Sequence, residues 1–166
     1  VIGGGDFAEN RIFPDLIRGV INKEITKVRN PKSTRPWQHV LDPLWGYVLT
    51  LAALLEGREI SSINFAPVGP SKSVKELVQI AIQIWDKFQI SQDNLDDSIQ
   101  GEMKLESTEL HLSSKFAKAQ LGWSPTYTQE RAIASTVNWW KLLLTLQLGA
   151  SDLISGEIKE FLKEKK

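Results

Sequence analysis

Residues 1–10 read VIGGGDFAEN, and their three consecutive glycines form either a phosphate-binding loop or a tight turn. Two β-branched apolar residues precede Gly3, a pattern typical of a strand that runs into a turn. A dinucleotide-binding loop has the spacing Gly-x-Gly-x-x-Gly before a helix, whereas Gly5 is followed by Asp6, a carboxylate where a phosphate would lie. The stretch therefore predicts a tight turn. Because it opens within a strand and without Met, we also expect a piece of a longer chain.

Beyond this turn, apolar periodicity and capping residues predict helices separated by short strands. The expected helices cover residues 11–22, 42–55, 73–88, 114–121, 126 or 128 to 146, and a last segment from 151. The expected strands cover residues 1–2, 24–29, 37–41, 62–66 and 110–112. Asp42 is predicted to cap the second helix, and Ser73 to form a capping box with Glu76. Strands this short and separated favour an α+β fold or a piece of a larger α/β protein.

The composition is that of an ordinary globular protein, with 42% hydrophobic and 24% charged residues among 166. Lysine and arginine number 20 and balance 20 acidic residues, so the basic excess typical of nucleic-acid binding is missing. The absence of cysteine excludes disulfides and thiolate metal sites, and it suits the reducing cytoplasm, where we expect the protein. No apolar run reaches the ~18 residues of a membrane span. We therefore expect neither a nucleic acid nor a membrane as a partner.

Few side chains are placed to carry chemistry. His39 and His111 each fall within an expected strand, so each is predicted to be a packed or surface residue, and no metal site is expected. Arg11 directly follows the glycine turn, and Arg35 follows the turn residues 30–34. The planar fork of an arginine suits a diphosphate, although ordinary surface ion pairs are the more frequent role of arginines beside loops.

Longer stretches resemble a known enzyme family. VIGGGDFAENRIFPDLIR at residues 1–18 and RNPKSTRPWQHVLDPLWGY at residues 29–47 are similar to the carboxy-terminal half of CDP-glucose 4,6-dehydratases, which are extended short-chain dehydrogenases/reductases. INFAP, SVKELV, KAQLGWSP and TVNWW follow in the family's order, so the similarity extends to about residue 143. The resemblance implies the mostly helical substrate-binding lobe of a Rossmann-type α/β enzyme. We expect one domain over residues 1–166, with a frayed tail at 157–166.

The resemblance also implies which residues bind the substrate, a CDP-sugar. Arg11 and the backbone of Ile12 match positions that contact the nucleotide in related dehydratases. Arg35 matches an arginine that binds the diphosphate, and Glu106 falls near the nucleoside. The residues that flank Glu106, together with Ser113, depart from the family's pattern, which bears on nucleotide preference.

The cofactor fingerprint and catalytic residues of this family lie in its amino-terminal half. The family's Tyr-x-x-x-Lys pair is missing here, since Leu51 stands four residues after Tyr47 and Arg131 four residues after Tyr127. The resemblance implies that the full-length parent uses NAD to convert CDP-glucose to CDP-4-keto-6-deoxyglucose for deoxysugar and polysaccharide biosynthesis. It implies no catalytic, cofactor-binding or metal-binding residue in this chain, which we expect to be inactive alone.

Two other interpretations stay open. The chain is alternatively a half-domain of another nucleotide-sugar epimerase or reductase, or a non-catalytic module that binds a nucleotide sugar or assists assembly. Apolar surface that normally packs against a cofactor lobe is exposed when that lobe is absent, and large exposed patches favour association. We therefore expect a homo-oligomer.

Overall fold

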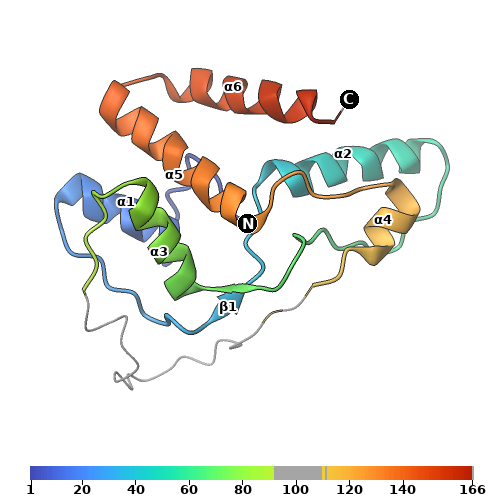
Figure 1. The fold of residues 1–166 in the computed structure, drawn as a ribbon. Helices are drawn as coiled ribbons and strands as arrows, with labels where there is room; N and C mark the ends of the chain where they lie inside the picture. Colours follow the sequence, from blue (N-terminus) through green and yellow to red (C-terminus); the bar gives the residue numbers. More distant parts are fainter. Residues whose placement is uncertain (92–109, 111, 166) are drawn as a thin grey trace.

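The computed structural model describes residues 1–91, 110 and 112–165. Their elements are α1 (Ile12–Asn22), β1 (Thr34–Arg35), α2 (Leu41–Leu55), β2 (Lys72–Ser73), α3 (Val74–Ile84), α4 (Lys115–Leu121), α5 (Gln129–Leu146) and α6 (Ala150–Lys163) (Figure 1). The fold is mostly helical with one small sheet, which confirms the fold class expected from the sequence. None of the helices in these ranges has the length and hydropathy that a membrane span needs.

Regular strands are fewer than the sequence predicts. β1 and β2 pair antiparallel as two-residue strands. In place of the expected strands at 24–29 and 37–41, single parallel bridges join Thr26 to Ile90 and Ile2 to His39. The expected strand at 62–66 is wrong, because this segment is irregular and is held by the burial of its apolar side chains instead. Of the expected strand at 110–112, Leu110 and Leu112 lie in no regular element and His111 lies outside the described residues.

Local capping signals account for several helix ends. The hydroxyl of Ser73 accepts the amide of Glu76 at 3.1 Å, and the Glu76 carboxylate accepts the amide of Ser73 at 2.7 Å, so the predicted capping box of α3 is confirmed. Thr128 caps α5 by accepting the amide of Arg131 at 3.2 Å. α4 ends at Gly122, whose φ of 64° lies in the left-handed region that glycine adopts most readily.

Two predicted helix ends are wrong. α2 begins at Leu41 without a side-chain cap, so Asp42 does not cap it. The helix predicted to reach residue 88 ends at Ile84. Beyond it Trp85 leaves the helical conformation and packs edge-on against Phe88, and both rings are buried in the core. Burial of these two aromatic rings therefore outweighs continuation of the helix.

Most of the segment predicted to fray, residues 157–166, belongs to α6, which ends at Lys163. Phe161 is 3% exposed and stacks on Tyr127, with 6.1 Å between the ring centroids. Arg131 of α5 forms a two-pronged ion pair with Glu164. An apolar anchor and an ion pair thus both hold α6 against α5.

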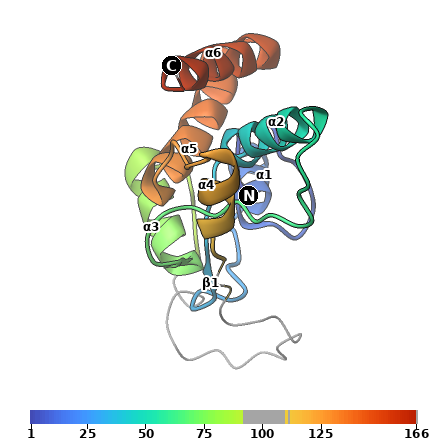
Figure 2. The ribbon, with the colours of Figure 1, turned by 90° about the vertical axis from the view of Figure 1, so that its right-hand side faces the viewer.

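The helices gather around two apolar clusters. The larger one contains Leu16 and Ile17 of α1, Leu77 of α3 and Ile133 and Val137 of α5. The smaller one contains Phe65, Ala117 and Trp123 beside α2 and α4. α1 and α3 thus lie on one side of α5, and α2 and α4 lie on the other (Figure 1). α6 lies along the top of the molecule in both views (Figures 1 and 2).

Candidate functional site

The glycine turn is shaped by packing. Ile2 donates its amide to Gln38 at 2.8 Å and accepts the amide of Val40 at 2.9 Å, which fixes the segment before the turn. A Cβ on Gly4 would lie 2.1 Å from the Trp139 ring, and a Cβ on Gly3 would lie 2.8 Å from Val40.

Gly5 completes the turn with a φ of 80°, a conformation that side chains with a Cβ disfavour. The predicted tight turn is therefore confirmed, and each of the three glycines has a reason of packing or conformation. On the side where a Cβ would stand, Gly3 and Gly4 are covered by the side chains of Val40 and Trp139.

Arg11 lies at the rim of a small cavity beside this turn. The cavity measures about 160 Å³ and is lined by Val1, Ile2, Gly3, Gly4, Asp6, Arg11 and Val40. The Arg11 side chain is 63% exposed, and its Nη1 atom lies 3.1 Å from Oδ2 of Asp6. The other Asp6 oxygen accepts the amide of Ala8 at 3.1 Å, so this carboxylate both closes the loop and orients Arg11. Ile12 begins α1 and packs partly buried against the larger core.

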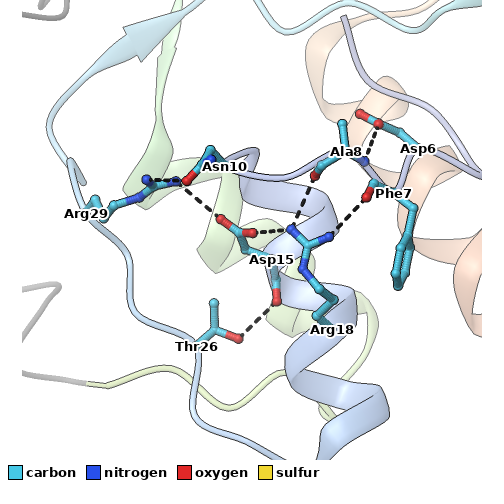
Figure 3. A network of polar contacts seen from close by, with 8 residues as sticks. All are labelled: Asp6, Phe7, Ala8, Asn10, Asp15, Arg18, Thr26 and Arg29. Carbon is cyan, nitrogen blue, oxygen red and sulfur yellow. Dashed lines mark hydrogen bonds and ion pairs between the residues drawn. The ribbon is translucent and has the colours of Figure 1, made fainter.

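A second arginine holds the loop that leads to Arg11 (Figure 3). Arg18 points from α1 toward the loop and donates to the carbonyl oxygens of Phe7 and Ala8 at 3.0 and 3.2 Å. Asp15, one turn earlier on α1, accepts from Arg18 and lies 3.4 Å from Arg29. A guanidinium bound to two carbonyls and a carboxylate fixes the loop at several points.

The same network reaches the last loop residue. Arg29 donates to the side-chain oxygen of Asn10 at 2.9 Å, and Asn10 has a φ of 63°. Sequence reasoning missed this network. The spacing of Asp15 and Arg18 on a helix is a detectable signal for an ion pair, but nothing local indicates that Arg18 also binds backbone carbonyls ten and eleven residues away.

Arg35 lies in β1, where it is half-buried and donates to the carbonyl oxygen of Thr34 at 2.8 Å. The neighbouring Trp37 donates its ring nitrogen to the Lys72 carbonyl at 2.9 Å and its amide to the Gln129 side chain at 3.1 Å. Lys72 also pairs with Glu130 at 2.8 Å, and the hydrogen bond to Glu130 raises the pKa of Lys72. The small sheet is thereby tied to the first turn of α5.

The predicted site residues therefore sit on different elements. Arg11 and Ile12 are neighbours at the start of α1, beside the glycine turn. Arg35 belongs to the sheet. Glu106 lies outside the described residues. Ser113 precedes α4, where its hydroxyl accepts the amide of Lys115 at 3.4 Å.

A buried polar cluster stands behind the turn. His39 is fully buried, stacks on Tyr127 with 4.4 Å between ring centroids, and places Nε2 3.2 Å from a carboxylate oxygen of Glu157. Burial opposes ionisation of Glu157, but hydrogen bonds from His39 and Ser135 hold its pKa below the usual value. His39 is thus packed in the core, one of the two placements, packed or surface, that the sequence predicts.

Asp42 links this cluster to the approach of α5. Its carboxylate accepts the amide of Thr126 at 2.6 Å and that of Tyr127 at 3.2 Å, and its carbonyl accepts the Trp123 ring nitrogen at 3.0 Å. Burial raises the pKa of Asp42, while the hydrogen bonds from Thr126 and Tyr127 oppose that rise. Burial likewise raises the pKa of Tyr127 to about 12, and the nearby charge of Glu157 adds to the shift.

An open groove of about 450 Å³ separates α5 from α6. Tyr127, Trp139 and Glu157 line it together with more exposed polar residues, among them Asn138 and Asp152. No cluster of three or more potential metal ligands occurs within residues 1–91, 110 and 112–165.

Comparison with known proteins confirms the resemblance. The chain is 37% identical over 145 residues to CDP-glucose 4,6-dehydratase of Salmonella typhimurium strain LT2, and the match covers 85% of this chain. The chain spans only 39% of the length of that relative. No protein-family profile matches the sequence.

Solved structures share the fold at lower identity. dTDP-glucose 4,6-dehydratase of Bacillus anthracis, in complex with NAD, matches with a TM-score of 0.64 at 18% identity, over 83% of this chain and 41% of that one. UDP-glucuronic acid 4-epimerase of Bacillus cereus matches with a TM-score of 0.63 at 17% identity, over 86% of this chain and 43% of that one. An NAD-dependent NDP-hexosamine 5,6-dehydratase of tunicamycin biosynthesis matches with a TM-score of 0.64 at 19% identity, over 90% of this chain and 44% of that one.

Proposed function

We propose that this chain, a relative of CDP-glucose 4,6-dehydratase, is the sugar-nucleotide-binding portion of an NAD-dependent enzyme that converts CDP-glucose to CDP-4-keto-6-deoxyglucose. The observation that carries the proposal is the 37% identity to the Salmonella dehydratase over 85% of this chain. The solved structures share the fold at only 17–19% identity. An identity of 37% over 85% of the chain therefore supports a closer relationship than a common fold.

Arg11 and Arg35 are the proposed contacts for the charged part of the substrate. Arg11 stands exposed at the cavity rim, and its ion pair with Asp6 lies at the surface, where such pairs contribute little. Exchanging that carboxylate for a nucleotide phosphate therefore costs little. Arg35 supplies a second permanent cation with a fork suited to diphosphate, and the backbone of Ile12 and the Glu106 side chain complete the proposed set.

The redox chemistry belongs to NAD, which we propose is bound by the remainder of the enzyme. When bound there, NAD would supply the hydride transfer of a reaction in which the sugar is oxidised at C4, loses water across C5–C6 and is reduced at C6. The part of this chain is to bind and orient the nucleotide. We therefore expect this chain alone to be inactive, and the active protein to work in the cytoplasm as a homo-oligomer.

A second candidate is the corresponding portion of a nucleotide-sugar epimerase. The epimerase of Bacillus cereus matches the fold with a TM-score of 0.63, essentially as well as the dTDP-glucose dehydratase at 0.64. The fold thus does not separate the two activities, and the choice rests on sequence identity to the CDP-glucose enzyme.

Isothermal titration calorimetry of the chain with CDP-glucose, UDP-glucose and dTDP-glucose tests the proposal. We expect CDP-glucose to bind most tightly. Arg35→Met should weaken binding by about tenfold or more, since hydrogen bonds to charged groups contribute roughly 1.5–3 kcal/mol. Arg58→Met removes the same charge beyond the end of α2 and serves as the control. Tighter binding of UDP-glucose would favour the epimerase, and equal effects of both variants would refute the role of Arg35.

A further inference from the structure

α6 presents one apolar face to the core and a second one to solvent. On the inner face, Leu153 packs partly buried against the larger cluster, and Phe161 is buried within it. Ile154, Ile158 and Leu162 recur every four residues, so they lie together on another face of the helix. They are 45%, 40% and 43% exposed, and we call these three residues the α6 stripe. An apolar helix face that is open to water is typical of an interaction surface.

The surroundings of the α6 stripe suit the close approach of another helix. Ser151 and Ser155 stand three residues before Ile154 and Ile158, so these small, exposed side chains lie beside the stripe. Apolar surface also continues before the helix, because Leu146 and Leu148 are 62% and 43% exposed in the segment that leads into α6.

Charges of opposite sign stand at the two ends of one flank of α6. Asp152 lies in the first turn and Lys163 in the last. The eleven residues between their positions make about three helical turns, so both side chains lie along the same flank. Among the residues that the structure describes, neither of these exposed side chains takes part in an ion pair. Both charges are therefore available to a partner.

We propose that the α6 stripe is an interface between two copies of this chain, whose α6 helices pair antiparallel about a twofold axis at Ile158. Ile154 of each copy then faces Leu162 of the other, since both stand four residues from the axis. Asp152 of each copy lies beside Lys163 of the other. Every contact occurs twice, because a twofold interface uses the same patch on both copies.

The pattern of charges favours a second copy over another partner. Read in opposite directions, two α6 helices bring the acidic first turn of one to the basic last turn of the other, so this flank is complementary to itself. A parallel pairing would place like charges together, which is unfavourable. Five apolar residues and one ion pair per copy make an interface smaller than the roughly 20–30 residues a side of a standard one. The dimer should therefore be reversible and dependent on concentration.

The inference deepens the proposed function, in which the active protein is a homo-oligomer, by assigning a surface to that association. It requires neither NAD nor a sugar nucleotide. Failure of CDP-glucose binding in the calorimetric test therefore leaves it unaffected, and its own failure leaves the nucleotide-binding proposal standing.

Single cysteines test the geometry of the pair, because the chain contains none. In Ile158→Cys the two thiols face each other across the axis, so mild oxidation should convert most of the protein to a disulfide-linked dimer. Leu55→Cys at the end of α2, 80% exposed, is the control and should remain mostly monomeric. An equimolar mixture of Ile154→Cys and Leu162→Cys should form mixed dimers in excess over either homodimer. Equal cross-linking of Ile158→Cys and the control would overturn the proposed axis.

Sedimentation equilibrium measures the association without cross-linking. Asp152→Lys and Lys163→Asp should each raise the dissociation constant about threefold to tenfold, because each replaces two ion pairs by two repulsive contacts. The double variant Asp152→Lys/Lys163→Asp restores opposite charges and should return close to the natural value. Recovery of this kind cannot arise from a change in folding, which circular dichroism checks in each variant. A double variant weaker than both single ones would refute the pairing of these two charges.

Replacement of the central residue of the stripe tests the apolar part. Ile158→Asp should raise the dissociation constant about tenfold or more, while Leu55→Asp leaves it unchanged. A chain that stays monomeric at every concentration would overturn the proposal in favour of a different partner for α6. A dimer that is weakened by Leu55→Asp and not by Ile158→Asp would overturn it in favour of an interface at α2.

Discussion

Replacing Asp42 by alanine should destabilise the protein strongly, because two backbone amides depend on its carboxylate. Asp42 is 1% exposed, and its oxygens accept the amides of Thr126 and Tyr127 at 2.6 and 3.2 Å. These amides belong to the chain that enters α5, more than eighty residues away in sequence. No water replaces the lost acceptor readily at a site this buried.

The size of the effect follows from the two orphaned amides. Each buried donor left without a partner costs about 1–3 kcal/mol, so two cost about 2–6 kcal/mol. Burial raises the pKa of Asp42, which means that its ionised form is itself disfavoured in the folded protein at neutral pH. Removing the ion recovers part of that cost. We therefore expect Asp42→Ala to lower the free energy of unfolding by about 2–4 kcal/mol.

Urea unfolding followed by tryptophan fluorescence measures this change. Asp42→Asn keeps one oxygen acceptor and removes the buried charge, so it should lose only about 1–2 kcal/mol. Asp86→Ala removes an exposed carboxylate after α3 and should stay within about 0.5 kcal/mol of the natural protein. A loss below about 1 kcal/mol for Asp42→Ala would refute the assignment of this carboxylate as a structural acceptor.

Three further predictions concern the turn and the buried cluster. Gly4→Ala should lower the free energy of unfolding by at least about 1–3 kcal/mol, because its Cβ would lie 2.1 Å from the Trp139 ring. Gly156→Ala in α6 meets no atom within 4 Å and should raise the free energy of unfolding by about 0.5–1 kcal/mol. A thermal unfolding experiment in which Gly4→Ala is the more stable variant would contradict this packing. The pKa of Glu157 is lowered by its partners despite burial, so its stabilising contribution is complete above the unfolded pKa of 4.5 and is lost as pH falls through the folded pKa. In Glu157→Gln the free energy of unfolding should therefore fall less steeply as the pH is lowered. An unchanged pH dependence would show that other carboxylates dominate it. Absorbance at 295 nm should reveal a phenol that ionises near pH 12, and Tyr127→Phe should remove that step; its persistence would assign the step to another tyrosine.

Features set by neighbours in sequence were predictable. The capping box of Ser73, the threonine cap of α5 and the glycine end of α4 depend on residues within one turn, so their patterns are readable directly. Residues 62–66 have strand-like composition, but a strand also needs a partner, and Phe65 instead packs against Trp123.

The role of Asp42 shows why local patterns also mislead. Aspartate before proline is a good helix start, yet the same carboxylate serves two amides that are remote in sequence and close in space. At the site, the exposed Arg11 beside the turn was predictable as a candidate, whereas the grip of Arg18 on the loop carbonyls depends on how the loop folds back over α1.

The contact between Gly4 and Trp139 also sets the order in which the protein can be completed during its synthesis. The turn emerges from the ribosome before α5, which carries the indole that packs on it. At about 5–20 residues per second, the turn waits on the order of ten seconds for this partner. The glycine turn beside Arg11 therefore gains its packing against Trp139 only after α5 has been made.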